Sequence, residues 1–324
     1  MNSTLEYEIN SDNAAELFAR QAEAPAPPLK NFSGRGFVIC AGGPYLESAY
    51  VVVSLLRHYG ATLPIEVWHA GEDEIPVWAR PAFIEHGVVF HDIMDYCKNR
   101  SLKQMRGFPI KTAAILNTQL REVMFIDADC FPVRNLEFLF ETQEYKENRA
   151  IFFPDSQRHY LLPDKPVWEH VGMPYNGDTE FETGLLLFDK VSCWKALNLA
   201  EWMNMGSEFW YQHAMGDKDT FYLAWRKVQQ SYSLAPDCLR IPTVLSRHYW
   251  KGKKHLVDHR TGTSKYTAPS RKSIFTSYLS PYKGRPLYKD LIDEFLQRFV
   301  NKNYGLHTKF LDELKVYKDN SESL

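Results

Sequence analysis

The sequence predicts an α/β fold in which helices flank a mostly parallel, mixed sheet within a single domain. Short apolar runs end abruptly at glycine, proline or aspartate, as buried strands do, and segments with helical spacing of apolar residues separate them. In addition, 324 residues with 44% hydrophobic side chains are enough to build one large domain with a substantial core.

The first strand is expected over Gly36–Ala41, an apolar run that stops at Gly42. Apolar residues then recur at helical spacing over Tyr45–Tyr59, and Gly60 is a typical residue to end such a helix. A second strand is expected over Ile65–His69. Because a strand, a helix and another strand in succession form a βαβ unit, this part of the sheet is expected to be parallel.

The same alternation continues for most of the chain. Further strands are expected at Val88–Phe90, Val123–Ile126, Ala150–Phe153 and Gly184–Phe188, and helices at Lys111–Leu120, Ser192–Asn204, Asp217–Val228 and Leu287–Phe299. Residues 1–33 are expected to be a polar, proline-rich lead-in with a short helix near Ala14–Ala19. We therefore expect one domain over residues 34–300 and a C-terminal tail over residues 301–324.

Composition excludes several classes of protein. The 38 basic and 40 acidic residues nearly cancel, whereas nucleic-acid-binding proteins usually carry a basic excess. No run approaches 18 apolar residues, so no membrane span is expected, and the N-terminus does not resemble a signal peptide. The five cysteines contain no C-x-x-C pair, which argues against a structural zinc site or a disulfide framework. These features predict a soluble, cytoplasmic protein.

The strongest candidate site is the triplet Asp127-Ala128-Asp129, which directly follows the apolar strand Val123–Ile126. In open α/β sheets, ligands bind beyond the carboxyl ends of the strands. Two carboxylates at this place suit a hard divalent cation such as Mn²⁺ or Mg²⁺, which can bridge them to a diphosphate. The alternative is a plain loop in which aspartate caps a turn.

Two further segments are candidates for binding a phosphorylated ligand. After the first strand, Ala41, Gly42 and Gly43 allow a close backbone approach to phosphate or ribose, but a simple tight turn explains them equally well. Lys111 begins the helix that precedes the acidic triplet and is a candidate for holding a donor phosphate or sugar. The alternative is an ordinary solvated lysine.

Acidic residues later in the chain are candidates for contacts with a sugar. Glu182 precedes the apolar strand Gly184–Phe188 and is a candidate hydrogen-bond acceptor or base. Asp217, Lys218 and Asp219 begin a helix, where one aspartate would face the donor sugar and the lysine a phosphate. The alternative for both aspartates is a favourable interaction with the helix dipole.

Three late histidines, His248, His255 and His259, are candidates for a third metal ligand, because imidazole suits Mn²⁺ tolerably. His259 and His248 are the two that we assign to the metal site. None of them has a sharp spacing signal, and a surface position is the simpler expectation for each one taken singly.

Taken together, these segments resemble the fungal α-mannosyltransferases of glycosyltransferase family 71, which add α-1,2- and α-1,3-mannose to mannan side chains. The matching stretches are Arg35–Cys40, Leu63–Gly71 with Asp73, Lys111–Leu116, Glu122–Arg134, Phe152–Asp155, Glu182–Lys190 and Gly216–Trp225. They occur in the order of the family and span about residues 35 to 226, so the resemblance is specific although each stretch alone is weak.

The resemblance implies a Rossmann-like glycosyltransferase type A fold, a nucleotide-diphospho-sugar donor, a glycan or glycoconjugate acceptor and retention of the anomeric configuration. GDP-mannose is the favoured donor, with a UDP-sugar as the alternative, and a Golgi lumenal location would apply only if an anchor had been removed. By motif match, Asp127 and Asp129 would bind the metal, and Glu182, Asp217 and Asp219 would be catalytic. The implied donor-binding residues are Ala41, Gly42, Gly43, Lys111, Asp127, Ala128, Asp155, Gly184 and Lys218.

Two rival functions remain open at this point. A sugar-nucleotide pyrophosphorylase would carry a basic residue in the glycine-rich loop after the first strand, and Gly42-Gly43-Pro44-Tyr45 lacks one. A non-catalytic carbohydrate-binding protein would not require the intact pair Asp127 and Asp129.

Overall fold

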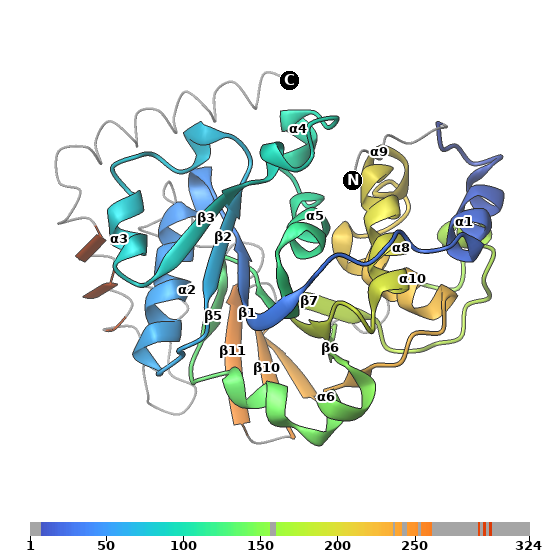
Figure 1. The fold of residues 1–324 in the computed structure, drawn as a ribbon. Helices are drawn as coiled ribbons and strands as arrows, with labels where there is room; N and C mark the ends of the chain where they lie inside the picture. Colours follow the sequence, from blue (N-terminus) through green and yellow to red (C-terminus); the bar gives the residue numbers. More distant parts are fainter. Residues whose placement is uncertain are drawn as a thin grey trace.

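The computed structural model describes residues 8–155, 160–235, 237–241, 245–251 and 254–260, together with residues 291, 294, 295, 298 and 299. Its centre is a seven-stranded sheet with the order β3-β2-β1-β4-β7-β6-β8 (Figure 1). These strands are β1 (Ser33–Cys40), β2 (Ile65–His69), β3 (Val88–Asp92), β4 (Leu120–Ile126), β6 (Ala150–Pro154), β7 (Phe181–Asp189) and β8 (Ser233–Leu234). Only β7 runs antiparallel to its neighbours, and every other pairing in this sheet is parallel. The predicted fold class, a mostly parallel mixed sheet with flanking helices, is confirmed.

Helices cover both faces of this sheet, with α2 on one side and α5, α8 and α10 on the other (Figure 1). Alternate residues of β1 enter the two layers: Phe37 and Ile39 pack in the cluster with α2, and Val38 packs in the cluster with α5 and α8. The helices are α1 (Ala14–Glu23), α2 (Leu46–His58), α3 (Arg80–Ile84), α4 (Leu102–Met105), α5 (Ile110–Asn117), α6 (Gln143–Asn148), α7 (Val167–Val171), α8 (Trp194–Met205), α9 (Ser207–Trp210) and α10 (Asp217–Lys227).

Several predicted helix boundaries need correction; for example, α1 extends to Glu23 rather than Ala19, and α8 begins at Trp194 rather than Ser192. The helix expected to reach Leu120 ends at Asn117, because the chain turns at Thr118 and Leu120 already pairs with Ser33 of β1. The helix expected to begin at Tyr45 begins at Leu46, after a short 3₁₀ turn. Of the helix predicted over Leu287–Phe299, residues 291, 294, 295, 298 and 299 are helical, and the others lie outside the described residues.

A second, antiparallel sheet of four strands was not predicted from the sequence. Its strands are β5 (Cys130–Pro132), β9 (Asp237–Ile241), β10 (Leu245–Trp250) and β11 (Lys254–Arg260), in the order β5-β11-β10-β9. Strand β5 begins directly after the acidic triplet, and its residue Cys130 pairs with His259 of β11. The small sheet therefore carries a histidine from late in the chain to the carboxyl end of β4.

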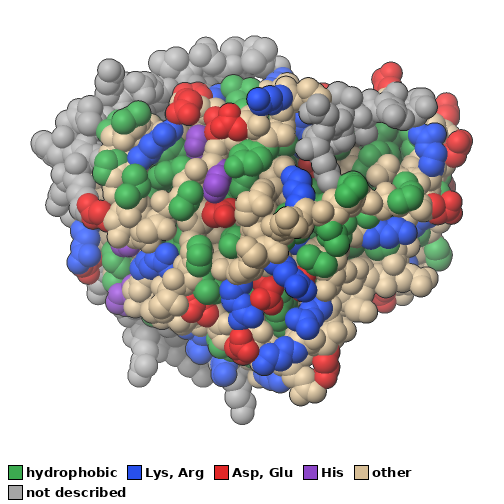
Figure 2. Space-filling model, in the orientation of Figure 1, with side chains coloured by type: hydrophobic (Ala, Val, Ile, Leu, Met, Phe, Trp, Pro, Cys, Tyr) green, Lys and Arg blue, Asp and Glu red, His purple; other side chains and the backbone are tan. Residues whose placement is uncertain are grey.

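The surface agrees with the nearly balanced composition. On the face shown in Figure 2, basic and acidic side chains are interspersed, and hydrophobic side chains lie scattered among them. Within the part of the chain that the structure describes, no helix is both long enough and apolar enough to cross a membrane.

The N-terminal helix α1 belongs to the core of the molecule. Its residue Phe18 is fully buried and lies against Trp202 and Trp210, with ring centroids 6.3 and 5.7 Å away. The segment that was expected to be a polar lead-in thus covers one end of the helical layer formed by α7 and α8.

Phe18→Ala is expected to lower the free energy of unfolding by about 3–5 kcal/mol, because it removes a buried aromatic ring and leaves a cavity. Glu16→Gln, at an exposed position of the same helix, is the control and should change stability by less than about 0.5 kcal/mol. Denaturant unfolding of both variants measures the difference. Equal, small effects would mean that α1 does not pack on the domain in solution.

Candidate active site and metal centre

A cavity of about 600 Å³ opens at the carboxyl ends of β1 and β4, where the fold class predicts a ligand. Most of the residues predicted for the site line it. They are Ala41, Gly42, Lys111, Asp127, Ala128, Asp129, Asp155, Glu182, Asp217, Lys218 and His259. The predicted residues Gly43, Gly184, Asp219 and His248 are not among those that line the cavity.

Backbone and side-chain hydrogen bonds hold the acidic triplet in place. The Asp127 N–H donates to the carbonyl of Gly184 on β7 at 2.9 Å, and the Ser48 hydroxyl of α2 donates to the carbonyl of Ala128 at 2.6 Å. Asp129 is buried, whereas the side chain of Asp127 is one-quarter exposed. Burial raises the pKa of Asp127, Lys111 and His259 oppose this, and Asp129 adds to it; together these effects bring the pKa to about 6.

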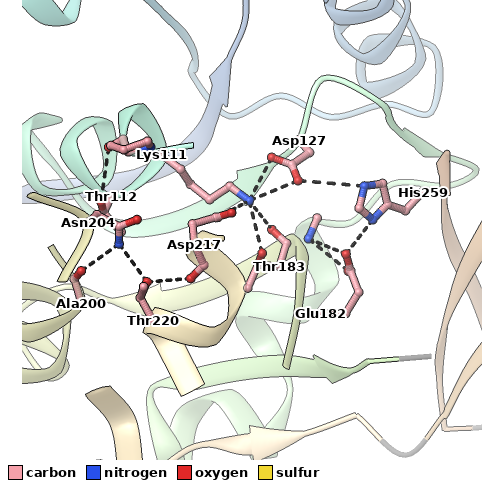
Figure 3. Close-up of polar contacts among 12 residues, drawn as sticks. Lys111, Thr112, Asp127, Glu182, Thr183, Ala200, Asn204, Asp217, Thr220 and His259 are labelled. Atoms are coloured by element: carbon pink, nitrogen blue, oxygen red, sulfur yellow. Dashed lines mark hydrogen bonds and ion pairs between the residues drawn. The ribbon is translucent and has the colours of Figure 1, made fainter. Parts of the chain in front are cut away.

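Lys111 is a buried lysine at the centre of the site, not the ordinary solvated lysine that was the alternative (Figure 3). Its Nζ lies 3.1 Å from Asp127 Oδ1 and 2.8 Å from Asp217 Oδ2, and it donates to the carbonyl of Thr183 at 3.1 Å. Burial lowers the pKa of Lys111, but the charges of Asp127 and Asp217 outweigh that effect and keep it above its ordinary value. Lys111 therefore links the ends of β4 and β7 to the first turn of α10.

His259 joins the acidic triplet to Glu182. Its Nε2 lies 3.3 Å from Asp129 Oδ1 and 4.0 Å from Asp127 Oδ2, and its Nδ1 lies 2.6 Å from Glu182 Oε1. The opposite oxygen of Glu182 lies 2.7 Å from Nε2 of the fully buried His248. The expectation of surface positions was wrong for both histidines, because β10 and β11 turn them inward toward β7.

The pKa shifts of this group have one electrostatic cause. Burial alone would raise the pKa of Glu182, but the charges of His259 and His248 hold it well below its usual range. Conversely, burial would lower the pKa of His259, and the charges of Glu182 and Asp129 hold it well above.

A second lysine, Lys218, sits among three carboxylates. Its Nζ lies 3.0 Å from Asp155, 3.2 Å from Glu180 and 2.6 Å from Asp219. Asp219 is fully buried beneath the cavity wall, and its other oxygen accepts the N–H of Met215 at 2.7 Å. Glu180 was missed from the sequence, although its spacing of two from Glu182 places both on one side of an extended chain.

The glycines after β1 are explained by packing and turn geometry. A Cβ on Gly42 would lie 2.0 Å from a carboxylate oxygen of Glu74, and Gly43 has a positive φ of 49° at the start of the 3₁₀ turn. Glu74 lines the cavity and was not predicted from the sequence. Burial raises its pKa to about 7, although the charge of Arg106 partly opposes this. The tight turn that was the alternative for these glycines is therefore present.

The donor set suits a divalent cation. Asp127, Asp129 and His259 each offer a ligand atom, and these atoms lie within 4.8 Å of one another at the edge of the cavity. Two carboxylate oxygens and an imidazole nitrogen fit Mn²⁺. A second group, Glu182, His248 and His259, meets the same distance limit and shares His259 with the first.

Comparisons with known proteins agree on one group of enzymes. A family model described as a putative mannosyltransferase matches residues 34–168 and 170–259, which is more than half of the chain. Candida albicans α-1,2-mannosyltransferase MNN2 is 25% identical over 273 residues, covering 69% of this chain and 44% of that protein. Saccharomyces cerevisiae α-1,2-mannosyltransferase MNN5 is 26% identical over 351 residues, covering 90% of this chain and 57% of that protein. The chain thus spans about half the length of these relatives.

Among solved structures, mouse xyloside xylosyltransferase 1 is similar to this chain with a TM-score of 0.41 at 17% identity. The similarity covers 62% of this chain and 85% of the mouse protein.

Lys218→Met is expected to lower the free energy of unfolding by about 3–5 kcal/mol near neutral pH, because three buried carboxylates lose their cation. Burial already raises the pKa values of Glu180 and Asp219, and Lys218 opposes this, so the variant raises them further. A carboxylate with a raised pKa in the folded protein binds protons more readily there than when unfolded, and acid therefore favours folding.

The difference in the free energy of unfolding between the wild type and Lys218→Met should consequently shrink as the pH falls from about 8 to about 5. Urea unfolding at both pH values measures it, and Lys103→Met, at an exposed lysine, is the control. A deficit that does not change with pH would contradict the assigned charge cluster.

Proposed function

Since the chain belongs to the putative mannosyltransferase family, we propose that it is a metal-dependent, retaining glycosyltransferase. It transfers mannose from GDP-mannose to a hydroxyl of a glycan or glycoconjugate. The observation that carries this proposal is the grouping of Asp127, Asp129 and His259, whose ligand atoms lie within 4.8 Å of one another beside a cavity of about 600 Å³.

The charge balance of the site supports a bound cation. Seven carboxylates lie close to Lys111, Lys218 or His259 beyond the carboxyl ends of β1 and β4; they are Asp127, Asp129, Asp155, Glu180, Glu182, Asp217 and Asp219. Both Lys111 and Lys218 already contact carboxylates, so neither brings an uncompensated positive charge to a diphosphate. Such an acidic wall repels an anionic donor unless a divalent ion lies between them.

Asp127, Asp129 and His259 would hold Mn²⁺ or Mg²⁺. The ion, when bound, neutralises charge on the diphosphate and stabilises it as a leaving group. The other residues support this arrangement. Lys111 fixes the carboxylate of Asp127, and Asp217 is held by the same lysine at the cavity wall, where a donor sugar would lie.

In the proposed reaction the acceptor oxygen forms a bond to the anomeric carbon while the bond from that carbon to the diphosphate oxygen breaks. The bonding electron pair leaves with the diphosphate, and the acceptor proton passes to the departing phosphate oxygen. Attack occurs on the face from which the leaving group departs, so the configuration is retained. No separate base is required, and stabilisation of the leaving group's charge supplies most of the rate gain.

Asp127→Asn and Asp129→Asn are each expected to lower the rate of mannose transfer at least about 100-fold, because each removes a charged ligand without changing side-chain size. Asp95→Asn, at an exposed aspartate, is the control. Transfer to a simple α-mannoside, followed by detection of the product, measures the effect. EDTA should reproduce the loss in the wild type, and Mn²⁺ should reverse it. Full activity in either site variant would reject the metal assignment.

Thermal-shift measurements with GDP-mannose, UDP-glucose and UDP-galactose, each with and without Mn²⁺, test the donor. A ligand that binds the folded state raises the melting temperature, by an amount that grows with its concentration relative to Kd. We expect a shift with GDP-mannose that requires Mn²⁺. A larger shift with a UDP-sugar would assign the donor to the alternative class, and binding without donor turnover would favour a non-catalytic carbohydrate-binding protein.

A further inference from the structure

We propose that Glu182 is a positioning residue that fixes the orientation and tautomer of His259. His248 in turn holds Glu182 by contacting its other carboxylate oxygen. This inference rests on the proposed function, because it concerns the residue that completes the metal site. It replaces the catalytic role that the sequence motif suggested for Glu182.

The first argument is the geometry of His259. Its Nδ1 lies 2.6 Å from Glu182 Oε1, and its other nitrogen, Nε2, faces Asp127 (Figure 3). The same Nε2 lies 3.3 Å from Asp129 Oδ1. A lone pair on Nδ1 could not face a carboxylate oxygen at that distance without strong repulsion, so Nδ1 carries the proton, although the contact is not aligned as an ideal hydrogen bond. Once Nδ1 is protonated, Nε2 is the nitrogen that offers its lone pair to an ion.

The second argument is that Glu182 has no oxygen left for a substrate. Both of its carboxylate oxygens accept the N–H of Gly184, each at 3.0 Å. One oxygen contacts His259 and the other contacts His248 at 2.7 Å. Although Glu182 lines the cavity, each of its oxygens has two contacts that fix it in position, which suits support of a ligand better than proton transfer to a moving substrate.

The third argument is that the absence of a side chain at residue 184 makes room for the His259 ring in this position. Gly184 lies directly under His259, and a Cβ there would be 2.5 Å from His259 Nδ1. The carbonyl of the same glycine accepts the N–H of Asp127 at 2.9 Å. The backbone of one residue on β7 therefore sets the relative positions of Asp127, Glu182 and His259.

The second possible metal group, Glu182 with His248 and His259, is less suited to hold the ion. His248 is fully buried, its ring stacks on Phe153 with centroids 4.8 Å apart, and it does not line the cavity. An ion that must meet a diphosphate has to lie at the cavity, where Asp127, Asp129 and His259 are found. We therefore assign His248 to the support of Glu182.

The test is Mn²⁺ binding to the full chain without nucleotide, measured by calorimetry. Glu182→Ala should weaken Mn²⁺ binding by about 10- to 100-fold, as loss of an outer hydrogen-bond partner does at other metal sites. Glu182→Gln should recover most of the affinity, because the amide oxygen can take the place of Glu182 Oε1 beside Nδ1. His248→Phe, which keeps a ring on Phe153, should have a smaller effect than Glu182→Ala. Glu141→Ala, at an exposed glutamate, is the control.

Electron spin echo spectroscopy of bound Mn²⁺ adds a readout that general loss of structure would not mimic. Modulation from an imidazole nitrogen should be present in the wild type and in Glu182→Gln, and reduced in Glu182→Ala at saturating Mn²⁺. If Glu182→Ala folds poorly, comparison of Glu182→Gln with the wild type still tests the role, since a marked loss of affinity in that variant would contradict it.

Three further results would overturn the inference. Unchanged Mn²⁺ affinity in Glu182→Ala together with lost transfer would mean that Glu182 acts on the substrate. Loss of Mn²⁺ binding in His248→Phe but not in Asp129→Asn would place the ion on the Glu182 group. Absence of Mn²⁺ binding in the wild type would also refute it. The transfer assay with GDP-mannose, run with and without EDTA, then decides the proposed function separately.

Discussion

The arrangement of the site depends on one electrostatic constraint, the crowding of seven carboxylates at the carboxyl ends of the sheet. Carboxylates this close raise one another's pKa unless cations separate them. Lys111 lies between Asp127 and Asp217, and Lys218 lies among Asp155, Glu180 and Asp219. The two lysines pair with five of these carboxylates, whereas Asp129 and Glu182 contact His259 instead. The negative charge that the lysines do not offset is what makes the site suitable for a divalent ion.

The fold creates this crowding of charges by bringing together segments that are far apart in the sequence. The parallel part of the sheet presents the triplet at the end of β4, as expected for an open α/β sheet. The antiparallel strand β7 brings Glu182 and Gly184 beside the triplet, and the small sheet adds His259 through the pairing of β11 with β5. Reversal of β7 therefore matters for function, because it places the first residues of that strand, rather than its last, at the carboxyl end of β4.

The sequence predicts the parts of this site that depend on local signals. The strand before Asp127, the helix that begins near Lys111 and the first turn of α10 all follow from apolar periodicity and from where it stops. The burial of His248 and His259 does not, because it depends on contacts with distant parts of the chain: β11 pairs with β5, and the His248 ring stacks on Phe153 of β6. The requirement for glycine at position 42 could not be predicted for the same reason. A side chain there would collide with Glu74, which lies more than thirty positions later in the sequence.

The buried ion pairs of Lys111 and Lys218 at the cavity wall are better explained by positioning than by stability. A buried ion pair contributes little net stability, because desolvation of both groups offsets their attraction, yet loss of one partner is costly. The two lysines join different elements: Lys111 connects α5 with β4 and α10, and Lys218 connects α10 with the end of β6 and the residue before β7. Each lysine thus limits the positions of two or three carboxylates at once, including carboxylates that line the cavity. His259 is positioned in a similar way by a carboxylate, because Glu182 contacts its Nδ1 and leaves Nε2 facing Asp129. Asp127 and His259, which are proposed to hold the ion, are therefore each positioned by a buried group of opposite charge, Lys111 and Glu182 respectively.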